Sequence, residues 1–278
     1  MANKEDYFLR EPMPDSHERD ADGKTTRQNI ISFDNQVLPD ANQYFRITWY
    51  RQPMMKSPAT HIHDTPEYIG FLGSDPLNPK ELNGKVLFWL DGEWITIEKS
   101  AIIYVPAGMA HCPFIVQEAK LPIIHFSGCP SGHYEQIPTS ESTFKRTGSV
   151  EDYVSYDSRP FMPGTETDPS ILSKIVWLDS SIMPGAPYIE FSWFLKAREP
   201  KPPTHVHDFD EIVGFIGSNP DDPGDLGATL NFKWDGENIR VDRSVVVYIP
   251  AGTYHCPFLI EDMKRPILSF SGGDGNRY

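Results

Sequence analysis

The sequence predicts an all-β protein built from two tandem antiparallel barrels that arose by internal duplication. Three observations support this prediction. The second half of the 278-residue chain repeats the first, and Asp-Gly pairs, which favour two-residue hairpins, recur at matching places in both halves. Helical periodicity is weak, and the 26 prolines and 20 glycines are scattered along the chain, which leaves little room for long helices. Barrels or sandwiches hide the strand edges of all-β units of this size.

The repeat has a constant offset of 144 residues over its best-matching part. Residues 61–128 align without a gap with residues 205–272, and roughly 31 of these 68 positions are identical. The match extends upstream, where Trp49 faces Trp193 and the tripeptide at 5–7 recurs at 151–153. We therefore predict an N-terminal barrel with a leading arm at 1–148 and a C-terminal barrel at 149–278.

The elements follow from short local signals. Residues 86–97 and 230–241 are β-rich segments that flank Asp91-Gly92 and Asp235-Gly236, so each is expected to be a hairpin. Pro-Ala-Gly at 106–108 and at 250–252 marks a tight turn after an apolar run. The apolar segment at 121–128 is expected to be a further strand.

Composition and charge narrow the class of protein. Hydrophobic residues make up 39% of the chain, which is enough to bury a core. The net charge of −14 and the lack of a basic stripe argue against a nucleic-acid partner. We expect no membrane partner and a cytoplasmic location, because no apolar stretch reaches bilayer length and the N-terminus lacks the apolar core of a signal peptide. The odd number of cysteines, three, predicts no disulfide framework.

Six of the nine histidines fall into three pairs related by the repeat. Each half contains His-x-His-x-x-x-Glu and, 44 residues after the glutamate, a further His. Imidazole and carboxylate suit divalent Fe, Mn, Co, Ni or Zn. The candidate metal ligands are four residues in each half: His61, His63, Glu67 and His111, and then His205, His207, Glu211 and His255.

The spacing within each set is consistent with a metal site. Residues i and i+2 of a strand project from one face, so His61 and His63 can converge on one ion. Glu67 would lie roughly 13 Å away on a continuous strand, so a turn must intervene. The turn-forming residues at 64–66 and 208–210 supply one in each half. A lone strand histidine is usually structural, but two complete sets with the same spacing favour metal binding, with up to two ions per chain.

These residues carry a resemblance to a known family. The two sets, each with a Pro-x-Gly-x-x-His segment ending at His111 or His255, resemble the two motifs of the cupin superfamily, and the whole chain resembles a bicupin. The resemblance implies two double-stranded β-helix (jelly-roll) barrels, each with three histidines and one glutamate around a divalent ion. The sequence departs from the family pattern at the glycines that usually flank the motifs, where Met55, Glu199, Ser100 and Ser244 stand.

The resemblance implies metal-assisted chemistry on a small molecule. Four protein ligands on an octahedral ion leave two positions for water, substrate or O2. We expect a non-haem iron dioxygenase that acts on a small oxygenated compound, by analogy with other members. Two alternatives stay open: a redox-neutral metal-dependent lyase, decarboxylase or isomerase, and a non-catalytic protein that binds metal and a small ligand.

Differences between the halves suggest where catalysis takes place. His125 faces Ser269, Arg46 faces Glu190, and Arg51 faces Leu195. His125 on its strand is a candidate acid or base, with a structural histidine as the alternative, and Arg51 is a candidate for holding a substrate carboxylate, with a surface residue as the alternative. These differences favour the N-terminal site as the more catalytic one.

Two further expectations concern packing and assembly. Cys112 and Cys256 each follow a ligand histidine, so on a regular strand they point away from the metal and act as packing residues. Exposed strand edges and the leading arm are suited to pairing of two chains, and a homodimer is the corresponding hypothesis.

Overall fold

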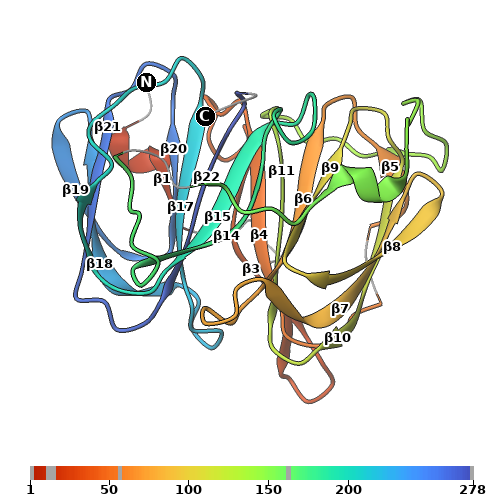
Figure 1. Cartoon of the computed structure of the whole chain (residues 1–278), viewed down its shortest axis with the longest axis horizontal. Helices are drawn as coiled ribbons and strands as arrows, with labels where there is room; N and C mark the ends of the chain where they lie inside the picture. The colour runs from red at the N-terminus through yellow and green to blue at the C-terminus, as the bar shows by residue number, and fades with distance from the viewer. Residues whose placement is uncertain (1–2, 11–16, 56–57, 161–163, 276–278) are drawn as a thin grey trace.

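The computed structural model describes residues 3–10, 17–55, 58–160 and 164–275. Its regular structure is almost entirely antiparallel β-sheet, arranged in two lobes (Figure 1). Within these ranges the helical segments are two short 3-10 turns, η1 (Lys4–Tyr7) and η2 (Val150–Tyr153). No helix in the described part of the chain is long and apolar enough to cross a membrane. The all-β prediction is confirmed.

The N-terminal lobe contains a seven-stranded and a five-stranded sheet. The larger sheet runs, in spatial order, through β13 (Val154–Ser155), β9 (Ala101–Val105), β6 (Glu67–Gly73), β11 (Ile123–Cys129), β4 (Tyr44–Tyr50), β3 (Thr25–Phe33) and β2 (His17–Arg19). The smaller runs through β12 (Ile137–Pro138), β5 (His61–Ile62), β10 (His111–Ala119), β7 (Glu81–Leu90) and β8 (Glu93–Lys99).

The C-terminal lobe contains a six-stranded and a four-stranded sheet. The larger runs through β1 (Phe8–Leu9), β20 (Val245–Ile249), β17 (Glu211–Gly217), β22 (Ile267–Gly273), β15 (Tyr188–Phe194) and β14 (Leu172–Leu178). The smaller runs through β16 (Arg198–Lys201), β21 (His255–Glu261), β18 (Asp225–Trp234) and β19 (Glu237–Arg243). Strands β6 and β17 begin 144 residues apart, as the repeat predicts.

The local turn signals form the predicted elements. Asp91 and Gly92 both have positive φ, 46° and 92°, and they connect β7 to β8 with Leu90 paired to Glu93. A two-residue turn with positive φ at both positions matches the right-handed twist of the flanking strands. Asp235 and Gly236 repeat the arrangement between β18 and β19. Both predicted hairpins are confirmed.

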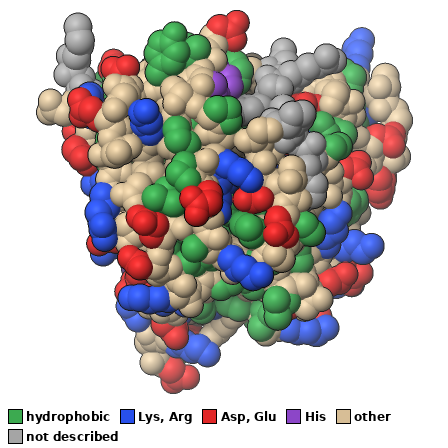
Figure 2. Space-filling model, turned by 60° about the vertical axis from the view of Figure 1, so that its left-hand side comes forward, with side chains coloured by type: hydrophobic (Ala, Val, Ile, Leu, Met, Phe, Trp, Pro, Cys, Tyr) green, Lys and Arg blue, Asp and Glu red, His purple; other side chains and the backbone are tan. Residues whose placement is uncertain are grey.

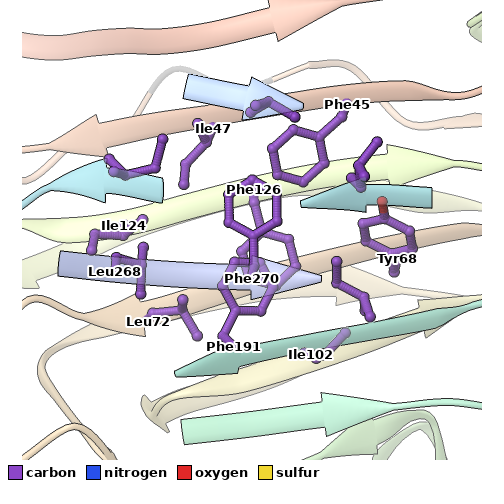
Figure 3. Packing of buried hydrophobic residues seen from close by; sticks show 14 of the residues in the cluster. Phe45, Ile47, Tyr68, Leu72, Ile102, Ile124, Phe126, Phe191, Leu268 and Phe270 are labelled. Atoms are coloured by element: carbon purple, nitrogen blue, oxygen red, sulfur yellow. The ribbon is translucent and has the colours of Figure 1, made fainter. Parts of the chain in front are cut away.

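The core lies in three layers. One apolar cluster fills the space between the seven- and five-stranded sheets, and a second fills the space between the six- and four-stranded sheets. A third joins the outer faces of the two large sheets, where Phe126, Phe191 and Phe270 pack together (Figure 3). Strands β6 and β17 are therefore buried on both faces, which explains why they are continuous apolar runs rather than alternating ones.

Each lobe is completed by a short strand from outside its own set of strands. β1, near the N-terminus, pairs with β20 of the C-terminal lobe, and β13 pairs with β9 of the N-terminal lobe. In Figure 1 the red N-terminal segment accordingly lies among the blue strands. The side chains of Lys4 and Glu237 form an ion pair that also ties the arm to this lobe. The division into domains at 1–148 and 149–278 stays a prediction.

We predict that Phe8→Ala lowers the free energy of unfolding by about 3 kcal/mol, because a large buried side chain would leave a cavity between β20 and β18. Phe8 is 3% exposed, and its ring centroid lies 6.0 Å from that of Phe232 and 5.7 Å from that of Trp234. Urea-induced unfolding measures the effect. A loss below about 1 kcal/mol would show that the arm does not contribute to the core.

Candidate metal centres

Three of the four N-terminal candidates are the first residues of strands, and the fourth, His63, directly follows one. His61 begins β5 and is paired with His111, the first residue of β10. His63 follows β5, a turn covers residues 64–65, and Glu67 begins β6. One ligand-type atom from each histidine lies within 4.8 Å of the others. Glu67 Oε2 lies 3.2 Å from His63 Nε2 and 3.1 Å from His111 Nε2. The predicted turn thus brings the carboxylate to the imidazoles.

The imidazoles are oriented so that Nε2 faces the shared centre. The Nδ1 atoms lie at hydrogen-bonding distance from backbone carbonyls: 2.6 Å from Ala59 for His61 and 3.0 Å from Met109 for His111. Donation from Nδ1 leaves Nε2 with its lone pair, the tautomer that a metal requires. All three Nε2 atoms and Glu67 Oε2 are buried without a hydrogen-bond partner in the described structure. Such a cluster of orphaned donor atoms fits a divalent ion.

Burial and contact also set the charge states of this cluster. Burial lowers the pKa of His61 to about 4, and the neighbouring His111 adds to that effect, so His61 is neutral at pH 7. Burial by itself raises the pKa of Glu67, but contact with His111 and His63 outweighs burial and lowers it to about 2. A neutral imidazole beside an ionised carboxylate is the combination that binds divalent cations.

The C-terminal candidates form an equivalent cluster. Ligand-type atoms of all four residues lie within 4.8 Å of one another. His205 and His255 face each other in an isolated bridge, and Glu211 Oε2 lies 3.0 Å from His255 Nε2 and 3.5 Å from His207 Nε2. Ser271 donates a hydrogen bond of 2.7 Å to Glu211 Oε1. This cluster is more open, since the His207 side chain is 16% exposed and the His63 side chain 4%.

The backbone after each last histidine departs from a regular strand. Cys112 and Cys256 have φ of 63° and 61°, in the left-handed region that non-glycine residues rarely adopt. Such strain is characteristic of functional sites. Both cysteines are buried in the apolar clusters, as expected for packing residues, and burial raises the pKa of both thiols. The regular-strand expectation fails locally, however, because both cysteines line the cavities described below.

Comparison with known proteins shows the fold. No protein-family model and no curated protein matches the chain. Solved structures do match over nearly its whole length. A variant of oxalate decarboxylase from Bacillus subtilis, with one tryptophan replaced by tyrosine, has a TM-score of 0.57 at 12% identity and covers 97% of this chain and 78% of its own. AerE from Microcystis aeruginosa has a TM-score of 0.52 at 13% identity, with coverage of 96% and 98%.

The chain has a cupin fold. A bicupin arrangement fits its length and its two histidine clusters, each placed where the cupin motifs of the sequence predict it. At 12–13% identity the similarity establishes the fold, and any activity has to be argued from the residues of the two sites.

The N-terminal cupin site opens into a cavity of about 290 Å³. Its walls alternate along the strands, because every second residue faces inward. Four strands, β3, β4, β11 and β6, contribute alternate residues to the wall. These are Arg27, Asn29, Tyr44, Arg46, Thr48, Tyr50, His125, Ser127, Glu67 and Ile69. Strand β2 adds Glu18, whose carboxylate lies 2.6 Å from the Arg27 guanidinium.

Sequence reasoning missed Tyr134, which lies between β11 and β12. Its hydroxyl donates a hydrogen bond of 3.2 Å to Glu67 Oε1, and its ring stacks on Tyr44 with a centroid distance of 4.1 Å. Burial raises the pKa of Tyr134, so the phenol stays protonated. A signal was present in the repeat, because Tyr134 is offset by 144 from Tyr278, which lies outside the described residues.

The two predicted catalytic candidates occupy different places. His125 lines the N-terminal cavity, its Nδ1 lies 3.0 Å from the carbonyl of Gly70, and its ring stacks on Phe71. Burial lowers its pKa to about 4, so His125 is neutral near pH 7 and cannot donate a proton as an imidazolium. Arg51 is absent from the cavity wall among the described residues, and its guanidinium lies 3.3 Å from Asp221 and 2.9 Å from Gln28.

The pKa of His125 predicts an acid-sensitive fold. Because the pKa is near 4 in the folded protein and about 6.5 in the unfolded chain, the unfolded chain alone takes up this proton between those values. Stability is therefore lost as the pH falls from 6.5 toward 4. His125→Phe is expected to remove up to roughly 3 kcal/mol of that loss, as measured by urea unfolding at several pH values. An unchanged pH dependence would contradict the buried, neutral state.

The C-terminal cupin cavity is smaller and carries different charges. Its volume is about 100 Å³. Glu190 stands where the N-terminal cavity has Arg46, and its carboxylate lies 3.1 Å from Lys174 Nζ and 3.8 Å from the Arg159 guanidinium. All three side chains line the cavity. The negative charge of Glu190 is therefore already compensated by Lys174 and Arg159 within the protein.

Proposed function

We propose that the protein is a metal-dependent enzyme that transforms a small organic compound at its N-terminal cupin site. The observation that carries this proposal is the convergence of three imidazole Nε2 atoms and one carboxylate oxygen, all buried and without hydrogen-bond partners in the described structure, beside a 290 Å³ cavity that His61 and Glu67 line. A cavity with a few convergent polar groups is the usual form of a small-molecule site.

The chain's own residues would divide the work at this site. His61, His63, Glu67 and His111 would hold a divalent ion, which would polarise a bound oxygen atom of the substrate as a Lewis acid. Tyr134 donates its hydroxyl proton in a hydrogen bond to the second oxygen of Glu67 and so orients the carboxylate, and its phenol oxygen on the cavity wall can accept a hydrogen bond from a bound compound. His125, neutral and stacked, shapes the wall.

The reaction class that we favour is redox-neutral: decarboxylation, lyase chemistry or isomerisation. These reactions require a Lewis-acid ion and no oxidant, and the site supplies a ligand set for such an ion, with Glu67 held in place by the Tyr134 hydroxyl. The similar solved structure with a named activity is a decarboxylase. The iron-dependent dioxygenase expected from the sequence stays the competing prediction, since the same ligand set also binds Fe(II).

One experiment separates these possibilities. The purified full chain is analysed for metal, stripped with a chelator, reloaded with Mn²⁺ or Fe²⁺, and assayed against small carboxylic compounds in air and under strict anaerobiosis. We expect about two metal equivalents per chain and turnover that depends on metal but not on O2. Turnover in air alone would establish the oxygenase. Ligand binding without product from any loaded form would establish a non-catalytic binding protein.

A further inference from the structure

An aromatic wall connects an arginine to the N-terminal ligand cluster. The Arg46 guanidinium carbon lies 5.9 Å from the centroid of the Tyr44 ring, which stacks on Tyr134, and Tyr134 lies 4.7 Å from the His63 ring. Burial raises the pKa of Tyr44 to about 12, so this phenol too is uncharged. The cavity therefore has a cationic end at Arg46, an aromatic side, and an end where His61 and Glu67 of the ligand cluster reach the wall.

The distance between these ends suits a ligand larger than a two-carbon acid. Arg46 pairs with Ser127 on β11, and Ser127 pairs with Ile69 on β6, so Arg46 is two strands, about 10 Å, from the strand that carries Glu67. By liquid volume the 290 Å³ cavity would hold about ten water molecules. This volume lies near the lower end of the range for small-molecule pockets, about 300 Å³, and so suits a compound the size of a single substituted ring.

The opposite cavity would not accept the same ligand. Its 100 Å³ would hold about three water molecules. Glu190 places a carboxylate where the N-terminal cavity has the Arg46 guanidinium, and its contacts with Lys174 and Arg159 compensate that charge within the protein. Lys174 and Arg159 are thus already engaged by Glu190, and the small volume of the cavity is what keeps out a ring-bearing ligand.

We propose that the N-terminal cavity selects a ring-bearing carboxylate, with the carboxylate at Arg46, the ring along Tyr44 and Tyr134, and an oxygen atom toward the histidines, and that the C-terminal cavity excludes it. This inference rests on the proposed function, because it names the substrate class of the same site. Arg46 is the specificity-determining residue: a guanidinium and a carboxylate form two parallel hydrogen bonds.

The test is a binding measurement on the Mn²⁺-loaded full chain with para-hydroxybenzoate and its uncharged analogue para-hydroxybenzamide. By calorimetry, we expect one equivalent of the carboxylate per chain and at least ten-fold weaker binding of the amide. Arg46→Gln is expected to weaken binding of the carboxylate 10- to 100-fold and to change the affinity for the amide by no more than about two-fold. Arg46→Lys keeps the charge but loses the geometry for two parallel hydrogen bonds. Its affinity for the carboxylate should therefore lie between those of wild type and Arg46→Gln.

Matched controls make each outcome decisive. Arg240→Gln removes an exposed arginine on β19, outside both cavities, and should change neither affinity. Equal affinities for acid and amide, no effect of Arg46→Gln in a variant that unfolds cooperatively, or two equivalents per chain would each overturn the inference. Metal content and turnover of the same samples test the proposed function separately. Charge-selective binding together with no product from any carboxylic compound in either metal-loaded form would leave the inference on ligand selection standing and would contradict the proposed enzyme.

Discussion

His61→Ala is expected to abolish turnover and to lower the metal content from about two equivalents per chain to one. The ring of His61 packs edge-on against His63 and His111, with centroids 4.8 Å and 4.4 Å away, and its Nε2 is one of the orphaned atoms of the N-terminal cluster. Loss of the ion removes several kcal/mol of charge stabilisation from the transition state, which corresponds to roughly 10³-fold in rate.

His205→Ala is the matched variant, because His205 occupies the same position in the C-terminal cluster. It should also lose one metal equivalent, but it should retain turnover and instead lower stability. At a free ion concentration of about 1,000 times Kd, a bound ion stabilises the folded state by about 4 kcal/mol. Elemental analysis, steady-state kinetics and thermal unfolding of both variants decide the matter. If His205→Ala loses turnover and His61→Ala keeps it, the catalytic site is the C-terminal one.

The ligand clusters could be predicted from sequence because their geometry is local and repeated. Two histidines two residues apart share one face of a strand, and the glutamate needs only a turn to join them. The last histidine follows the Pro-Ala-Gly turn, where Met109 N donates a hydrogen bond of 3.0 Å to the carbonyl of Pro106. Each step depends on neighbours in the chain, so the sequence contains the signal.

The sequence could not show in the same way whether Arg46 or Arg51 lines the N-terminal cavity. On β4 the residues with even numbers, Arg46 among them, line the cavity, while Trp49 packs in the core between the lobes. Arg51 shares the parity of Trp49, which is why it does not reach the cavity wall. Both faces of β4 are buried, so the sequence has no alternation of polar and apolar residues to show which face is which.

The short strands β1 and β13 and the backbone conformation at Cys112 could not be predicted from the sequence either. β1 and β13 have two residues each and pair with strands about 240 and 50 positions away, so their pairing is decided by tertiary contacts rather than by local pattern. At Cys112 a positive φ breaks the alternation that the sequence reading assumed. Surface charge does not indicate the pairing of β1 and β13 or the conformation at the cysteines, since acidic and basic side chains are interspersed on the face drawn in Figure 2.

Phe126→Ala is expected to lower the free energy of unfolding by about 3–5 kcal/mol, among the largest effects of any single core substitution in this chain. Phe126 is fully buried between the two large sheets, and its ring centroid lies 4.1 Å from that of Phe191 in the opposite lobe (Figure 3). The ring also covers Gly70, where an added Cβ would come 2.0 Å from Phe126 Cζ. The backbone at Gly70 is held by two strand partners and cannot move in to fill the cavity.

The same contact tests whether the two lobes are energetically coupled. Because Phe126 and Phe191 come from different lobes, the double variant Phe126→Ala/Phe191→Ala should lose about 0.5–1.5 kcal/mol less than the sum of the single losses. Leu121→Ala, at a side chain that is 41% exposed, is the surface control and should stay within about 0.5 kcal/mol of wild type. Urea unfolding, followed by both tryptophan fluorescence and circular dichroism, is measured for the four variants and for wild type. Strictly additive losses, or two separate transitions that each respond to only one of the phenylalanines, would mean that the lobes pack together without stabilising each other.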